Sequence, residues 1–291
     1  MSLLLAVPNV SQGRDQGAIA AIGGAFEATG ARLLDLHVDP DHNRSVYTLA
    51  GRPGELAYAL TEGAREVAKR VDMTRHTGVH PCVGALDVVP LVHIDDARRG
   101  AAAAEALVAA DEIAHAIETP VFLYGALADG RTRSDLREGG AKRLAKRMHS
   151  GELRPDFGPP RLHPTAGAVL VAARPPLVAF NVLLGPGVSL DAAKEIAARI
   201  REGGAEGLPG VRAIGLWLAH DRGAQVSCNV ERPAETPLRD VVEAVRRHAP
   251  VVAAELVGLA PQAAFESFPA DVPVPGFDPD RHILERLLHY A

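Results

Sequence analysis

"LLLAVPNV" (3–10) and "PLVAFNVLL" (176–184) are two apolar segments that open the two halves of the chain in the same way. Each is predicted to be a buried strand that ends at an asparagine, Asn9 or Asn181, with a turn close behind. After each segment the hydrophobic spacing predicts a helix, two strands, a second helix and a further strand. The repeated order indicates two copies of a β-α-β-β-α-β unit.

The expected elements follow from this spacing and from the glycines, prolines and cap residues between them. In the first half we expect strands at 3–8, 31–38, 43–50, 85–92 and 119–125, and helices at 14–29, 53–71, 95–117 and 134–149. In the second half we expect strands at 176–184, 211–219, 224–230 and 251–259, and helices at 189–204, 236–249 and 282–289, the first of them capped by Ser189.

The predicted fold class is therefore α/β (α+β), with two ferredoxin-like βαββαβ subdomains. Each subdomain is expected to have an antiparallel or mixed sheet with helices on one face. We place the domains at 1–175 and 176–291, joined near 160–175. The segment 153–168 is rich in proline and glycine, so it is either a plain linker or a binding loop beside a cleft.

The composition excludes several classes of protein. The chain has 291 residues, 47% of them apolar and 23% charged, and a formal net charge of −5. No basic stripe exists to neutralise phosphates, so we expect no nucleic-acid partner. No apolar run approaches the ~20 residues of a membrane span, and the N-terminus lacks the features of a signal peptide. Two cysteines give no disulfide framework, which favours a reducing, cytoplasmic location.

The stretch "RHTGVHPCVGALDVVP" (75–90) carries the densest chemistry. His76 and His80 have the spacing of metal ligands on a helix, but glycine and proline disfavour a helix here. Cys82 lies two residues after His80 and would share its side in extended chain, as a thiol–imidazole pair requires. A third interpretation is proton transfer by one histidine, oriented by Asp87. The fourth is that both histidines only pack.

Two further clusters are polar. "VDPDHNRSVYT" (38–48) combines Asp39, Asp41, His42, Asn43 and Arg44 in a predicted turn between strands, capped by its own side chains or presenting Arg44 to a carboxylate. In "DRGAQVSCN" (221–229), Gln225, Ser227 and Asn229 alternate along a predicted strand. They form either a solvated face or the neutral wall of an amide-binding pocket.

Eight stretches, in order, resemble the glutamate formiminotransferase family. They are "VPNVSQGRD", "DHNRSVYT", "DMTRHTGVHPCVGALDVVP", "PVFLYG", "PDFGP", "LVAFNVLL", "AIGLWLA…AQVSCN" and "ELVGLAP", and they extend from residue 5 to about 262. The resemblance implies two ferredoxin-like subdomains, usually in a homodimer. It also implies transfer of a formimino group from N-formimino-L-glutamate to N5 of tetrahydrofolate, the co-substrate, in histidine degradation.

The resemblance also assigns residues. The family's catalytic histidine precedes a proline in its "HP…GALD" motif and corresponds to His80, a general acid/base. Its folate-binding stretch corresponds to Gly158, Pro159, Pro160, Arg161, Leu162, His163, Pro164, Thr165, Ala166 and Gly167. The substrate brings two carboxylates, for which Arg44, Arg75 or Arg174 are reasonable partners. The candidate substrate-binding residues are Asn9, Arg44, Arg75, Asp87, Gln225 and Asn229.

This chain departs from the family at several positions. Cys82 and Val83 stand where the family commonly has arginine and methionine, Ala126 replaces a glutamate, and Ala166 replaces a tryptophan that could stack on folate. No fused cyclodeaminase domain is expected, which makes this a stand-alone form. No metal is expected, and small molecules are the expected partners. The alternatives are formyl transfer from 5-formyltetrahydrofolate to glutamate, a non-catalytic folate-binding paralogue, and a metal-dependent hydrolase built on His76 and His80.

Overall fold

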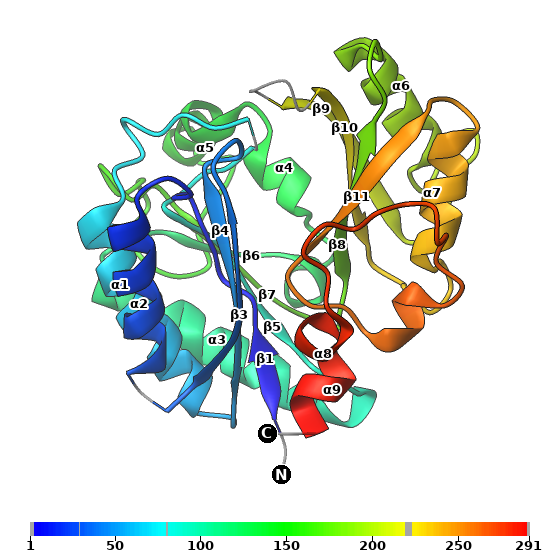
Figure 1. The fold of residues 1–291 in the computed structure, drawn as a ribbon. Helices are drawn as coiled ribbons and strands as arrows, with labels where there is room; N and C mark the ends of the chain where they lie inside the picture. Colours follow the sequence, from blue (N-terminus) through cyan, green and yellow to red (C-terminus); the bar gives the residue numbers. More distant parts are fainter. Residues whose placement is uncertain (1–2, 29, 80, 219–222, 290–291) are drawn as a thin grey trace. The chain divides into compact units, whose positions relative to one another are not determined.

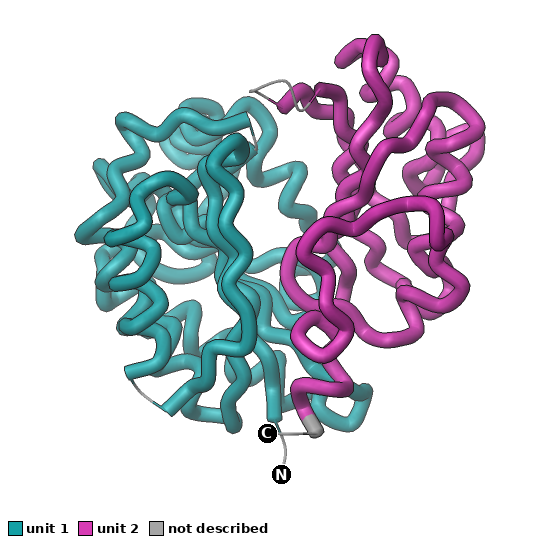
Figure 2. The backbone as a smooth tube through the Cα atoms, in the orientation of Figure 1, with its two compact units in different colours: residues 1–175 teal, residues 176–291 magenta. Residues whose placement is uncertain are grey.

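The computed structural model describes residues 3–28, 30–79, 81–218 and 223–289. The chain divides into two compact units, Met1–Pro175 and Pro176–Ala291, which Figure 2 shows in different colours. Each unit has its own sheet and its own hydrophobic core. The predicted fold class, a mixed α/β chain with two sheets, is confirmed.

Unit 1 contains a seven-stranded sheet (Figure 1). Its strands are β1 (Leu4–Ala6), β2 (Asn9–Val10), β3 (Arg32–Asp39), β4 (Arg44–Gly51), β5 (Leu86–Val92), β6 (Val121–Leu123) and β7 (Val169–Arg174). Its α-helices are α1 (Gln16–Glu27), α2 (Glu55–Arg70), α3 (Arg99–Ala116), α4 (Arg133–Arg137) and α5 (Gly140–His149), with 3₁₀ helices η1 (Asp96–Arg98) and η2 (Gly125–Leu127).

The central position of this sheet is shared by β1 and β2, which lie end to end between β4 and β5 and are antiparallel to both. The segment 3–10, which was predicted to hold one strand, is thus divided into two strands. Pro8 lies at the break, where its missing N–H cannot join the ladder. The carbonyl of Pro8 still accepts from the N–H of Tyr47 at 3.0 Å, so the chain stays attached to β4 across the gap.

Beyond β5 the sheet continues with β7 and then β6, both in parallel pairing. We expected residues 160–175 to join the two units. This prediction is wrong for residues 169–174, which form β7 inside the sheet of unit 1. Its sequence, "VLVAAR", is almost entirely apolar, as a strand buried on both faces requires. The boundary between the units therefore falls after Pro175.

Helices cover both faces of the unit 1 sheet, whereas one face was predicted. Alternate residues of β7 belong to different cores: Val169 and Val171 pack with α1, α2 and α3, while Leu170 and Ala172 pack with α4 and α5. The second layer exists because the helix predicted at 134–149 is broken. Gly139 and Gly140 both have positive φ, which ends α4 and starts α5 in a new direction.

Unit 2 contains a four-stranded antiparallel sheet in the order β11-β8-β10-β9 (Figure 1). Its strands are β8 (Val178–Leu184), β9 (Val211–Leu218), β10 (Gly223–Val230) and β11 (Val251–Val257). Its helices are α6 (Leu190–Ile200), α7 (Leu238–Arg246), α8 (Pro279–His282), α9 (Leu284–His289) and the 3₁₀ helix η3 (Gln262–Phe265). The predicted βαββαβ order is present, and Ser189 caps α6 by accepting from the N–H of Ala192 at 3.1 Å.

Apolar residues of β8 and β10 alternate into the core of unit 2 beneath α6 and α7, and their neighbours face the other side of the sheet. Asn181 was expected to end its strand but lies in the middle of β8. Its side chain is on the face of the sheet opposite the core, where a polar residue does not interrupt the strand. Its Nδ2 donates to Glu255 Oε2 at 2.8 Å. No described helix is both long enough and apolar enough to cross a membrane.

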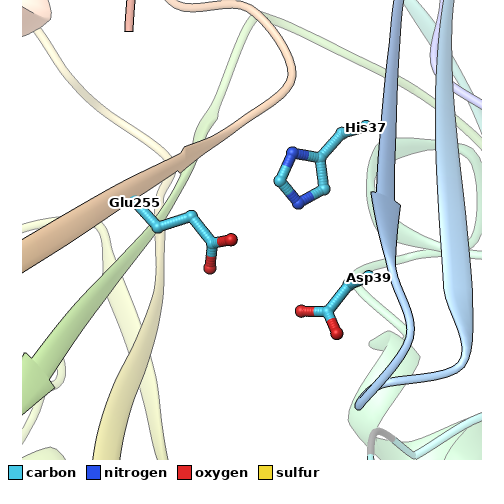
Figure 3. Close-up of side chains that lie close together, drawn as sticks. All are labelled: His37, Asp39 and Glu255. Atoms are coloured by element: carbon cyan, nitrogen blue, oxygen red, sulfur yellow. The ribbon is translucent and has the colours of Figure 1, made fainter. Parts of the chain in front are cut away.

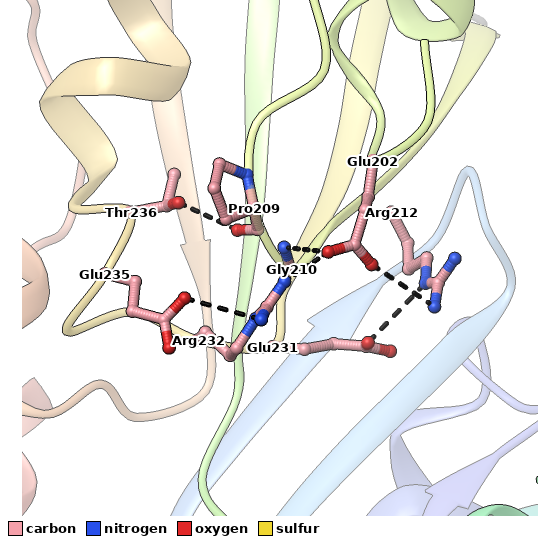
Figure 4. A network of polar contacts seen from close by, with 8 residues as sticks. All are labelled: Glu202, Pro209, Gly210, Arg212, Glu231, Arg232, Glu235 and Thr236. Carbon is pink, nitrogen blue, oxygen red and sulfur yellow. Dashed lines mark hydrogen bonds and ion pairs between the residues drawn. The ribbon is translucent and has the colours of Figure 1, made fainter.

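A surface network fixes the turn between α6 and β9 to the end of β10 (Figure 4). Glu202 accepts from the N–H of Gly210 at 3.0 Å and pairs with Arg232, and Thr236 Oγ1 donates to the carbonyl of Pro209 at 2.7 Å. Its remaining members are Arg212, Glu231 and Glu235. These charged side chains are 38–58% exposed, so each pair contributes little and the network is structural.

Candidate functional site

A small pocket lies in unit 1, at the end of the sheet where β2 and β4 meet. Three of the predicted substrate-binding residues, Asn9, Arg44 and Asp87, line it together. The full lining consists of Asn9, Val10, Ser11, His42, Asn43, Arg44, His76, Cys82 and Asp87. The sequence placed these side chains in three separate motifs, and the fold brings them to one site.

The strand register explains why they meet. Asn9 lies opposite Val46 of β4 on one side and Val88 of β5 on the other, so β2 is flanked by the start of both strands. The turn before β4 and the segment before β5 therefore converge on the chain that leaves β2. Hydrophobic alternation buries these strands and leaves their polar ends around the pocket.

A buried imidazole–carboxylate pair forms one wall of the site. His42 Nδ1 lies 2.5 Å from Asp39 Oδ2, and the two side chains are 1% and 3% exposed. The other carboxylate oxygen accepts from the N–H groups of Asp41 and His42 at 2.8 and 2.9 Å. Because the carboxylate can only accept, Nδ1 of a neutral His42 carries the proton and Nε2 holds the lone pair. The predicted polar turn at 38–48 is confirmed, and it also orients an imidazole.

His37 and Asp39 both project from β3, as Figure 3 shows. They are two residues apart and so share one side of the strand. Glu255, which the same figure labels, belongs to β11 of unit 2 and accepts the hydrogen bond from Asn181 there.

Asn43 connects three chain segments of the pocket. Its Oδ1 accepts from the N–H of Gly13 at 2.9 Å, and its Nδ2 donates to the carbonyl of Thr77 at 3.0 Å and to His76 Nδ1 at 3.3 Å. Its φ is +49°, a conformation that asparagine tolerates better than most residues. The segments approach so closely that a Cβ on Gly13 would lie 2.3 Å from the carbonyl oxygen of Asp39.

His76 is held as a neutral imidazole. Asn43 Nδ2 is a donor, so His76 Nδ1 accepts and the ring proton lies on Nε2. Burial is the largest influence and lowers the pKa of His76, and Arg14 lowers it further, whereas a hydrogen bond with the backbone of Ser11 and the charge of Asp87 raise it. Since Nδ1 is already engaged, His76 has the contacts of a structural residue rather than of a metal ligand.

Cys82 is half-buried at the pocket and has the properties of a resting thiol. Burial, followed by the charge of Asp87, raises its pKa, while a hydrogen bond with Ser11 and the charges of Arg137 and Arg44 lower it. The net shift is upward, which disfavours the thiolate. The interpretation of Cys82 as a nucleophile therefore has no support from its surroundings.

Asp87 is a buried carboxylate with two different partners. One oxygen accepts from the N–H of Val83 at 2.7 Å, and the other pairs with Arg137 of α4. The side chains of Asp87 and Arg137 are 5% and 13% exposed. Asp87 thus fixes the turn that carries Cys82, and Arg137 compensates its charge.

The stretch predicted to bind folate is exposed or half-buried, apart from Ala166 and Gly167 at its end, which are buried. Residues 158–162 are half-buried or exposed, with the guanidinium side chain of Arg161 at the surface. The second half forms a tight turn, in which His163 and Gly167 exchange backbone hydrogen bonds of 2.9 and 3.1 Å. Ala85 N–H donates to the carbonyl of Ala166 at 2.8 Å, so this turn is joined directly to the segment that precedes β5. The segment 153–168 is therefore an ordered part of unit 1 and not a plain linker.

The structure does not bring every predicted residue to the pocket. Arg75 is exposed and does not line it. Arg174 ends β7 and donates to the carbonyl of Pro175 at 2.9 Å. Gln225 and Asn229 lie in unit 2, on the face of β10 opposite its core. Gln225 is 1% exposed. His80 lies outside the described residues.

Sequence reasoning missed two residues of the site. Ser11 lines the pocket and donates to the carbonyl of Gly84 at 2.7 Å. Its spacing of two from Asn9 in an extended segment was a signal that could have found it. Arg137 had no such signal, since it lies 50 residues from Asp87 in a short charged helix.

Comparisons with known proteins match both units of the chain. Residues 3–174 match the model of the formiminotransferase domain, N-terminal subdomain, and residues 179–268 match that of the formiminotransferase domain. The chain is 34% identical to a glutamate formimidoyltransferase of Streptococcus pyogenes, covering 97% of both chains. It is 32% identical to one of Thermoplasma acidophilum, covering 100% of this chain and 99% of the relative.

A longer relative matches as well. The formimidoyltransferase-cyclodeaminase of Mus musculus is 37% identical over 90% of this chain and 51% of its own length. The chain thus spans about half the length of this and similar curated relatives. Two consecutive family models cover most of the sequence, and relatives of the same length exceed 30% identity. On this evidence the chain belongs to the formiminotransferase family.

Proposed function

We propose that this protein is a glutamate formimidoyltransferase, which transfers the formimino group of N-formimino-L-glutamate to N5 of tetrahydrofolate. The observation that carries this proposal is the family match along nearly the whole chain, to relatives of the same length that bear this name. The pocket of unit 1 supports it, because the motifs that resemble the family converge there. The two units would then be its N-terminal and C-terminal subdomains, each ferredoxin-like.

The reaction requires two proton transfers. The attacking amine must lose a proton, and the departing glutamate nitrogen must gain one, so the net proton balance is zero. An imidazole with a pKa near neutrality suits both steps and contributes roughly 10²–10⁴ in rate. We assign this role to His80 on the strength of the family motif. His76 is unsuited to it, because both Asn43 and the Ser11 backbone already engage its ring.

Recognition of the substrates needs cationic groups, since formiminoglutamate has two carboxylates and folate carries its own glutamate. Arg44 lines the pocket and is the candidate for the first substrate. We assign residues 158–167 to folate. Arg161 of this stretch is exposed to solvent, and the buried Ala166 at its end is hydrogen-bonded to the segment that leads to Asp87. The buried Ala166 offers no ring for stacking, so folate must be held by polar and charged groups here.

We also propose that the enzyme works as a cytoplasmic homodimer without a metal. Proton transfer by imidazole supplies the acid–base chemistry that the reaction needs. EDTA should therefore leave the rate unchanged, and light scattering should give twice the mass of the chain. Loss of activity in EDTA that zinc restores would favour the metal-dependent hydrolase instead.

The direct test mixes the purified protein with formiminoglutamate and tetrahydrofolate and follows the formimino product and free glutamate by mass spectrometry. We expect both products in equal amounts. His80→Ala should lower kcat by 10² or more, whereas the control His115→Ala, an exposed position on α3, should not change it. Tight folate binding without turnover would identify a binding paralogue. Glutamate formylation by 5-formyltetrahydrofolate alone would identify the formyl-transfer alternative.

A further inference from the structure

Arg137 is a cation placed directly behind the pocket. It projects from α4 and pairs through Nη2 with Asp87, which lines the pocket. Both side chains are largely removed from solvent, at 13% and 5% exposure. Among the described residues, Asp87 is the carboxylate that the structure pairs with Arg137. Solvent screening is weak at such a site, so the charge of Arg137 acts strongly on Asp87.

The pair determines the charge that a ligand meets. The lining contains one guanidinium, Arg44, and one carboxylate, Asp87, together with His42, His76 and Cys82. With Arg137 present, the charge of Asp87 is compensated, so this carboxylate does not repel an anion that reaches the lining. Without Arg137, the uncompensated carboxylate of Asp87 would repel an anion. A buried charge left without its partner also destabilises the fold, whether the partner removed is Arg137 or Asp87.

We propose that Arg137 makes this pocket receptive to a carboxylate-bearing substrate by neutralising Asp87. The inference rests on the proposed function, in which the substrate carries two carboxylates. Arg137 is thus a charge-setting residue that acts through Asp87 and does not itself touch the substrate. The proposal differs from a purely structural role, because removing both charges together should restore substrate binding.

Cys82 provides a reporter of this charge that needs no substrate. Burial and Asp87 raise the pKa of its thiol, and Arg137 and Arg44 lower it. The charged and titratable groups around it in the pocket are His42, Arg44, His76 and Asp87. Removing Arg137 should therefore raise the pKa of Cys82 further, and removing Asp87 as well should bring it back. The pH dependence of thiol alkylation measures this pKa separately from accessibility.

The experiment compares Arg137→Met, Asp87→Asn/Arg137→Met and Arg137→Lys with the wild type. The asparagine retains the Oδ1 acceptor for the N–H of Val83, so the turn keeps its hydrogen bond. The matched control is Arg147→Met: Arg147 also contacts α4, through the carbonyl of Asp135 at 2.8 Å, but pairs with Glu152 and not with the pocket.

We expect Arg137→Met to raise the KM for formiminoglutamate about 10- to 100-fold, the effect of one uncompensated buried charge at short range. The double variant should recover most of this loss, Arg137→Lys should recover part of it, and Arg147→Met should stay within about twofold of wild type. A KM unchanged in Arg137→Met, or a double variant no better than Arg137→Met, would overturn the proposal.

Two further measurements test the inference even if a variant does not fold or if the proposed function is wrong. If Arg137→Met does not fold, Asp87→Asn tests the same pair by removing its negative charge instead. The KM for formiminoglutamate should then fall, and a rise would contradict the proposal. If the wild type does not transfer the formimino group, the proposed function fails. The alkylation profiles of Cys82 then still decide whether Arg137 sets the charge of this pocket.

Discussion

Replacing Asn43 by alanine should destabilise unit 1 by about 3–5 kcal/mol. The amide of Asn43 holds the Gly13 N–H, the Thr77 carbonyl and the His76 ring, and its residue is 8% exposed. Alanine leaves the buried Gly13 N–H without its acceptor, at about 1–3 kcal/mol, and removes the donor for Thr77, at about 1 kcal/mol. The backbone at φ +49° adds about 1 kcal/mol, because alanine disfavours the left-handed region.

A second substitution separates these contributions. Asn43→Gly loses the same hydrogen bonds but tolerates positive φ, so it should be about 1 kcal/mol less destabilised than Asn43→Ala. Asn43→Asp keeps the acceptor for Gly13 and should fall nearest to the wild type in stability. Its carboxylate would face His76 Nδ1, so the pKa of His76 should rise in this variant.

Urea unfolding followed by far-UV circular dichroism, with linear extrapolation to water, measures these differences. The alkylation rate of Cys82 provides a local measurement, because the three segments joined by Asn43 enclose the same pocket. A destabilisation below 1 kcal/mol for Asn43→Ala would show that water replaces the amide at little cost. The glycine variant being as unstable as the alanine variant would refute the backbone contribution.

Three other predictions concern named contacts. The pKa of His76 is lower in the folded than in the unfolded chain. The stabilising effect of this residue is therefore complete above its unfolded pKa of about 6.5 and is lost as the pH falls through the folded value. The urea midpoints of the wild type and His76→Asn should converge on acidification. Glu105→Ala should lower the free energy of unfolding in urea by about 2–4 kcal/mol, because the buried Glu105 carboxylate accepts hydrogen bonds from two N–H groups at the start of α2, at 2.6 and 2.7 Å. The control Glu112→Ala leaves those two bonds in place and should stay within about 1 kcal/mol of wild type. Native protein should present one reactive thiol, since Cys82 is half-buried while Cys228 is 2% exposed with its pKa raised to about 12 by burial; rapid labelling of both would disprove the packing of β10.

Local patterns in the sequence predicted most elements to within a few residues. The alternation of apolar residues identified β8 and β10, and the cap at Ser189 located the start of α6. Such signals act over one or two turns, so they are readable without tertiary structure. They failed where a local signal was overruled: two glycines divided the helix at 134–149, and β7 resembled the end of a linker until its parallel partner β5 was known.

In the candidate site, too, the sequence showed which residues were present, and the structure showed which of them are in contact. The polar residues of the turn at 38–48 and of 75–90 were visible as clusters, and the family motif distinguished His80 from His76. Their spatial roles were not visible. Whether His42 meets Asp39, or Asn43 meets Gly13 and Thr77, depends on contacts that the strand register creates.

The sequence by itself determined the two-part α/β organisation and the family, because periodicity and motif order are local properties of the chain. The tertiary structure alone decided which buried charges compensate one another. Asp87 and Arg137 are 50 residues apart, and neither has a neighbour in sequence that predicts the other. Only the packing of α4 against the sheet brings them together in a place that water screens poorly. For this reason the chemical groups of the pocket could be named from the sequence, whereas the pairing of Asp87 with Arg137 could not.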